Sequence, residues 1–202
     1  MQPFTILTAV AAPYDRLNVD TDQILPARYL LKRRTDPDYP TYLFRDLRFR
    51  SDGSEHPGFV LNQSAYRNAR IFVGNSNFGG GSSREAAAIA FDRYGVRAVV
   101  APNFGDIFYN NCVKNGILPI RLPEEAAAAI RAQLHAQPGS TLTIDLPAET
   151  LTDVEGRVHG FVIDGFSKRC LVEGVNQIDL TLRELDAIEA FERRYRETHS
   201  WA

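Results

Sequence analysis

The sequence predicts an α/β domain built on a sheet that is at least partly parallel. Between residues 71 and 121, short apolar runs alternate with helical segments in the order strand, helix, strand, helix, strand. This alternation is typical of α/β cores. A glycine-rich turn also follows the first of these strands directly, which is where such sheets bind ligands.

The other elements follow from periodicity and turn residues. An opening strand is expected over residues 4–11, ended by Pro13, and buried strands are expected at 71–73, 97–101 and 117–120. Helices are expected at 85–94, 103–114 and 123–135. Residues 141–146, 150–153 and 158–163 are predicted to form antiparallel strands, with Glu155 and Gly156 turning the last pair.

We expect one domain over residues 1–202, because no internal repeat or linker-like segment divides the chain. Residues 33–62 hold aromatic side chains without clear periodicity and are predicted to be an insertion that packs on the core. Residues 177–197 are predicted to form a C-terminal helical tail, with one long amphipathic helix over 177–196. Its apolar stripe, expected to contact the core or a partner, consists of Leu180, Leu182, Leu185, Ile188 and Phe191.

Composition excludes several classes of function. A net charge of -2 and a pI near 6.1 leave no basic excess for nucleic acid. No apolar window is long enough to span a membrane and no signal peptide is evident, so we expect a cytoplasmic protein. Cys112 and Cys170 are expected to be free thiols. Two cysteines are too few for an iron–sulfur cluster or a structural zinc, so any such cofactor must come from another chain.

Residues 74–88 carry the strongest chemical signal. Three consecutive glycines let a ligand approach the main chain, and the next residues, Ser82, Ser83 and Arg84, lead into an alanine-rich helix. Either serine is expected to cap this helix, so that its first amides and the Arg84 guanidinium face one space. The loop is therefore predicted to hold a carboxylate beside a serine that can transfer a proton. The alternative is a glycine-rich turn that binds nothing.

Two common phosphate motifs do not fit this loop. A Walker loop would need lysine where Gly80 stands, and a dinucleotide fingerprint would need its third glycine where Arg84 stands. A polar turn over residues 18–26 precedes a basic segment, residues 27–34, that is read as a solvated loop or short helix. Asp20 is expected to act in turn chemistry and capping, whereas capping and a place in the site are both open for Asp22.

Ordered motifs at residues 18–24, 78–85, 101–112, 161–168 and 180–182 resemble, nearly end to end, the small subunits of bacterial 3-isopropylmalate dehydratase. This family is the swivelling domain of the aconitase superfamily. The resemblance implies a swivelling β/β/α fold that binds no metal or cofactor itself. It also implies a large-subunit partner, in a heterodimer or heterotetramer, that carries a four-iron four-sulfur cluster.

The resemblance further implies dehydration and rehydration of a small hydroxy diacid, which interconverts 2- and 3-isopropylmalate in leucine biosynthesis. Ser82 would be the base and Arg84 would hold a carboxylate, with Gly81, Ser83 and Asp22 beside them. The family's substrate-selecting loop falls on Tyr29, Leu30, Leu31 and Lys32. Leu31 would offer an apolar wall where relatives acting on longer tricarboxylates carry arginine.

The chain also departs from the usual family pattern. Gly80 replaces a cysteine and Ala86 a histidine, Ala88 and Ile89 stand where Pro-Trp is usual, and Gly165 and Ser167 replace a common Pro and Arg. The shell around the expected base is therefore smaller and less polar. Two alternatives follow: a diverged paralogue that dehydrates another alkylmalate, such as citramalate or dimethylmalate, or a catalytically silent assembly subunit. A third, from another class, is an independent small-molecule-binding protein.

Overall fold

The computed structural model describes residues 1–199 and 201, and its sheet has the strand order β4-β3-β2-β1-β5-β6-β7. β1 to β4 are parallel and comprise Ile6–Pro13, Ile71–Val73, Ala98–Ala101 and Leu118–Arg121. β5 to β7 are antiparallel and comprise Thr141–Asp145, Thr150–Thr152 and Val158–Gly160. Both predicted kinds of pairing are therefore confirmed.

β1 joins the two halves of the sheet. It pairs in parallel with β2, where Ala11 faces Ile71, and antiparallel with β5, where Leu7 faces Ile144. The strand begins and ends two residues later than the predicted range of 4–11. The strand begins later because the Phe4 amide donates to the carbonyl of Leu171 instead of a neighbouring strand, and it ends later because Pro13 still pairs with Val73 of β2.

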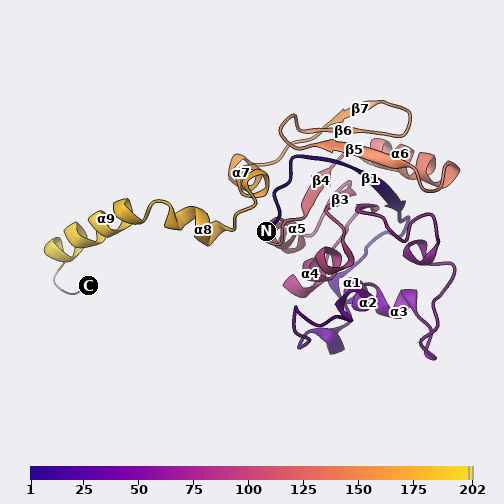
Figure 1. Ribbon diagram of the computed structural model, residues 1–202, viewed down its shortest axis with the longest axis horizontal. Coiled ribbons are helices and arrows are strands. Elements are labelled where there is room, and N and C mark those ends of the chain that lie inside the picture. Colours follow the sequence, from indigo (N-terminus) through magenta and orange to yellow (C-terminus); the bar gives the residue numbers. More distant parts are fainter. Residues whose placement is uncertain (200, 202) are drawn as a thin grey trace.

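Helices cover both faces of the parallel strands (Figure 1). α4 (Glu85–Tyr94) and α5 (Asp106–Lys114) share a core with Phe72 and Val99. α6 (Glu124–Ala136) packs Ile130 and Leu134 into a second core with Ile71 and Val100. Neighbouring strand residues thus point to opposite cores, as the pleat of a strand requires. All three helices lie within three residues of their predicted bounds.

Residues 21–62 form short helices against the first core: α1 (Thr21–Ile24), η1 (Ala27–Tyr29), α2 (Tyr39–Tyr42), α3 (Arg45–Arg48) and η2 (Val60–Asn62). Tyr39 and Phe44 in this region are almost fully buried. Phe44 meets Phe91 of α4 edge to face, with ring centroids 5.7 Å apart. Tyr39, Tyr42, Phe44 and Phe59 thus belong to the first core, whereas Phe49 is only partly buried.

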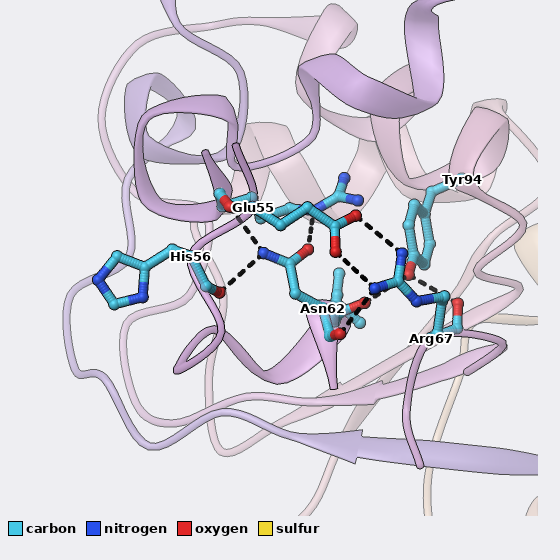
Figure 2. Close-up of polar contacts among 7 residues, drawn as sticks. Glu55, His56, Asn62, Arg67 and Tyr94 are labelled. Carbon is cyan, nitrogen blue, oxygen red and sulfur yellow. Dashed lines mark hydrogen bonds and ion pairs between the residues drawn. The ribbon is translucent and has the colours of Figure 1, made fainter. Parts of the chain in front are cut away.

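A polar cluster joins this region to the end of α4 (Figure 2). The Arg67 guanidinium binds both carboxylate oxygens of Glu55, at 2.8 and 2.5 Å, and the Asn62 carbonyl at 2.8 Å. The hydroxyl of Tyr94, the last residue of α4, donates to the Arg67 carbonyl at 2.7 Å. Arg48 is buried beside Asn62, and this burial lowers its pKa. The cluster fixes the far end of the helix that begins at the glycine loop.

The C-terminal part forms α7 (Gly165–Glu173), α8 (Gln177–Leu182) and α9 (Leu185–Thr198), and the last two extend away from the sheet (Figure 1). The prediction of one helix over 177–196 is wrong. The Arg183 and Glu184 amides donate to carbonyls three residues back, as is typical of a helix end, and α9 begins at Leu185. Arg183 also forms an ion pair with Glu173 of α7.

The expected apolar stripe does not pack on the core. Leu180 is buried, whereas Leu182, Leu185 and Phe191 are 45–58% exposed. α9 has no buried residue. None of the helices in the described part of the chain has the length and apolar run needed to cross a bilayer.

The buried amide of Asn62 provides a test of the polar cluster. It donates to the carbonyls of Arg48 and His56, at 2.6 and 3.0 Å, and accepts from the Arg48 guanidinium at 3.3 Å. Asn62→Ala should lower the free energy of unfolding by about 2–3 kcal/mol, because it leaves buried polar groups unpaired. Urea denaturation measures this change. The exposed Asn68→Ala is the matched control, and equal stability of the two variants would contradict the role given to the cluster.

Candidate active site

The glycine loop, residues 74–84, leaves the carboxyl end of β2 and leads into α4. Along it lies a second segment, residues 18–22, which follows β1 at the same edge of the sheet. Parallel strands place their carboxyl ends side by side, so the two segments meet although about 60 residues separate them in the chain. The site was predicted at this edge.

Main-chain hydrogen bonds join the two segments. The Gly79 amide donates to the Val19 carbonyl at 2.6 Å, and the Thr21 amide donates to the Gly80 carbonyl at 3.0 Å. Asp20 and Gly80 form an isolated parallel bridge. The two segments are therefore paired as in a short parallel sheet, and the 18–22 segment fixes the backbone of Gly79 and Gly80.

Each glycine has a different constraint. Gly79 has a φ of +72°, and a Cβ there would lie 2.3 Å from the Phe108 ring, so a side chain has no space. Gly81 has a φ of +87°, which favours glycine although the nearest atom to a Cβ would be 3.5 Å away. Gly80 has no such φ, and its Cβ would meet only the Asn77 side-chain oxygen at 3.3 Å. A Cβ atom at this position therefore needs only a small shift of Asn77.

The predicted serine cap of α4 is wrong. Arg84 is the N-cap residue, with an extended backbone at φ −130° and ψ 98°, and no side chain caps the first turn. Ser82 and Ser83 lie before this residue and are exposed. The extended entry through Arg84 holds both serines one or two residues too far upstream to reach the first amides. These amides are therefore left open at the positive end of the helix.

Arg84 and Asp22 form an ion pair, which brings two predicted site residues together. The Arg84 side chain is 18% exposed and the Asp22 side chain 51% exposed, so the pair lies at the surface with the guanidinium on its inner side. Asp20 accepts a bond from the Gln23 amide at 2.7 Å and caps α1, as expected. Asp22 is thus the one of the two carboxylates that contacts the loop.

Thr21 was not among the predicted site residues. It is 1% exposed, and its hydroxyl donates to the Ser82 carbonyl at 3.0 Å. The one feature of the sequence that could have indicated a role for Thr21 is its place between Asp20 and Asp22 in the motif at residues 18–24. The contact itself depends on pairing between distant segments and has no local pattern.

The residues expected to select substrate, at positions 29–32, make their described contacts with other parts of the chain. Tyr29 stacks on Tyr42 with ring centroids 4.3 Å apart, and Lys32 lies 3.9 Å from the Asp36 carboxylate. Leu31 is 97% exposed and Leu30 is 38% exposed. Among the described residues, no hydrogen bond or ion pair joins positions 29–32 to Ser82 or Arg84. Because Leu31 is so exposed, it can form one wall of a substrate site only if another surface lies opposite it.

The cysteines do not fit an iron–sulfur cluster. Cys112 on α5 and Cys170 on α7 are both buried and free, and burial raises the pKa of each thiol. Thiolate ligands need the opposite shift. Across residues 1–199 and 201, no group of three or more His, Cys, Asp or Glu side chains is arranged to hold a metal ion.

Comparisons with known families fit this architecture. A model described as the aconitase C-terminal domain matches residues 1–125, and one described as LeuD_N matches residues 128–165. A third, described as the C-terminal domain of the 3-isopropylmalate dehydratase small subunit, matches residues 178–202. The fold is therefore the swivelling β/β/α domain of the aconitase superfamily.

Individual relatives narrow the assignment. The chain is 48% identical to the 3-isopropylmalate dehydratase small subunit of Rhodospirillum centenum, covering 100% of this chain and 99% of that protein. It is 46% identical to the same subunit of Roseobacter denitrificans, with both chains fully covered. A crystal structure of 3-isopropylmalate dehydratase from Methanocaldococcus jannaschii superposes with a TM-score of 0.66 at 26% identity, covering 92% of this chain and 99% of that one. The chain belongs to the family of 3-isopropylmalate dehydratase small subunits.

Substitutions at two neighbouring glycines test the loop geometry. Gly79→Ala should lower the free energy of unfolding by about 2–4 kcal/mol, because the methyl group overlaps Phe108 at a positive φ. Gly80→Ala should change it by less than about 1 kcal/mol, because the backbone there suits any residue. Thermal and urea unfolding of both variants measure the difference. A Gly80→Ala variant as unstable as Gly79→Ala would show that the loop takes another path.

Proposed function

We propose that this chain is the small subunit of a hydro-lyase that interconverts 2-isopropylmalate and 3-isopropylmalate in leucine biosynthesis. The observation that carries the proposal is the exposed Ser82 beside Arg84, which Asp22 orients at the carboxyl edge of the sheet. The name shared by relatives of matching length supports the substrate. The free thiols suit a reducing compartment, and we place the enzyme in the cytoplasm.

Arg84 is proposed to bind one carboxylate of the substrate. Its guanidinium offers several donors in a planar fork that matches a carboxylate. The Asp22 carboxylate holds one side of this fork, so the guanidinium is oriented by the chain itself. The open amides at the start of α4 add a positive potential in the same region.

Ser82 is proposed to take the proton from the carbon next to that carboxylate. A serine hydroxyl is a weak base in water, so its alkoxide needs a nearby cation and helix dipole. Arg84, two residues along, and the N-terminus of α4 supply both. As the proton moves to the Ser82 oxygen, the C–H electron pair forms the double bond and the hydroxyl leaves from the adjacent carbon. Rehydration on the other carbon gives the isomer.

The departing hydroxyl needs a Lewis acid that this chain does not hold. We propose that the large-subunit partner holds a four-iron four-sulfur cluster, which supplies this Lewis acid when bound. The exposure of both serines supports such a partner, because proton transfer from carbon needs a site closed to water. The proposed assembly is a heterodimer, or a heterotetramer if the large subunit also contacts a second copy of itself.

The small residues near Ser82 support a second candidate class of substrate. Gly80 and Ala86 remove the sulfur and imidazole of the family pattern, while the Arg84 and Asp22 pair stays in place. Such changes favour retained chemistry on another alkylmalate, for example citramalate or dimethylmalate. They give less support to a silent assembly subunit, which has no need for an oriented arginine beside two serines.

The substrate is tested with the chain assembled anaerobically with the large subunit of the same organism. Absorbance of the unsaturated acid should rise fastest with 3-isopropylmalate when citramalate and dimethylmalate are assayed in parallel. A preference for either of the other malates would support the paralogue. If a verified cluster is present and none is turned over, the assembly role replaces the proposed function.

Ser82→Ala tests the base. Turnover of the assembled enzyme should fall by about 10²–10⁴-fold, because the general base is lost. Co-elution with the large subunit should not change, because the Ser82 hydroxyl makes no described contact that holds the fold. The exposed Ser64→Ala is the control and should keep full activity. Normal turnover of Ser82→Ala would refute the role of Ser82.

A further inference from the structure

Thr21 is buried and contacts the main chain of the loop that carries Ser82. It is the first residue of α1 and is almost fully buried, next to the capping residue Asp20. Its amide binds the Gly80 carbonyl and its hydroxyl binds the Ser82 carbonyl, both at 3.0 Å. One residue thus holds the loop on both sides of Gly81.

The loop needs support at this point. Gly81 has a φ of +87°, and as a glycine directly before Ser82 it leaves the main chain more conformational freedom than any other residue would. Within residues 1–199 and 201, the bond from Thr21 is the single hydrogen bond that the structure gives to Ser82. Without it, the segment from Gly81 to the start of α4 has no anchor until the Arg84 ion pair.

The support under Thr21 is itself rigid. Asp20 caps α1, and Ile24 at the other end of this turn is fully buried. The Phe44 amide donates to the Ile24 carbonyl at 2.7 Å, which ties α1 to the aromatic core. The Thr21 hydroxyl therefore connects the main chain of Ser82 to a turn that is fixed to the core.

We infer that Thr21 is a positioning residue for the reaction: its hydroxyl holds the Ser82 main chain so that the Ser82 oxygen meets the carbon that loses the proton. The inference rests on the proposed function, because it assigns Thr21 a part only if Ser82 is the base. Thr21 is 1% exposed, so its part is to position Ser82 and not to contact the substrate. A small displacement of a reacting group can cost a large factor in rate, so this bond affects kcat more than binding.

The test uses Thr21→Val in the assembled enzyme, with 3-isopropylmalate as substrate. Valine keeps the shape of threonine but loses the donor. kcat should fall about tenfold, the rate equivalent of one hydrogen bond, while KM stays within about twofold. Thr21→Ser, which keeps the hydroxyl, should recover most of the rate. The matched control is Thr143→Val, which loses a 2.9 Å hydroxyl bond to Thr8 on the distant part of the sheet.

Hydrogen exchange of the loop amides gives a readout that does not depend on activity. The amides of Gly79 and of residue 21, which are bonded to the Val19 and Gly80 carbonyls, should exchange faster in Thr21→Val than in the wild type, and not in Thr143→Val. An unchanged kcat, unchanged exchange, or failure of Thr21→Val to assemble would each overturn the inference. If the wild type itself does not turn over 3-isopropylmalate but the loop exchange responds as predicted, the proposed function fails and the structural contact stands.

Discussion

The pairing of residues 18–22 with the glycine loop is the interaction on which the site depends. Two main-chain bonds fix Gly79 and Gly80, a side-chain bond fixes Ser82, and an ion pair orients Arg84. The segments follow neighbouring parallel strands, so the sheet brings them together before any side chain contributes. The contacts of Ser82 and Arg84 with the 18–22 segment are thus a consequence of strand order.

The surrounding core makes this pairing rigid. Gly79 lies against Phe108, and the rings of Phe78, Phe91 and Phe108 pack at centroid distances of 5.8–6.2 Å. The polar cluster around Arg67 holds the end of α4, while the loop holds its start. The site therefore lies on elements fixed at both ends, with exposed serines facing outward. This arrangement suits a subunit whose partner closes the site.

Local sequence patterns were sufficient for the regular elements and for the edge that holds the site. Apolar runs marked β2 to β4, and alanine-rich segments marked α4 and α6, because burial and helix propensity are local properties. Three features could not be predicted. The prediction of a serine cap failed because the path through Arg84 depends on pairing with a distant segment. The tail divides into two helices near Arg183, which pairs with Glu173 of α7, and Thr21 contacts Ser82 across 61 positions.

The most direct test of the account is a structure of the assembled enzyme with 3-isopropylmalate bound. The account predicts that the Arg84 guanidinium contacts a substrate carboxylate and that the Ser82 oxygen is the nearest protein atom to the proton lost beside it. The Thr21 hydroxyl should still bind the Ser82 carbonyl. A substrate whose carboxylates are held elsewhere, with Ser82 facing solvent, would contradict the central claim.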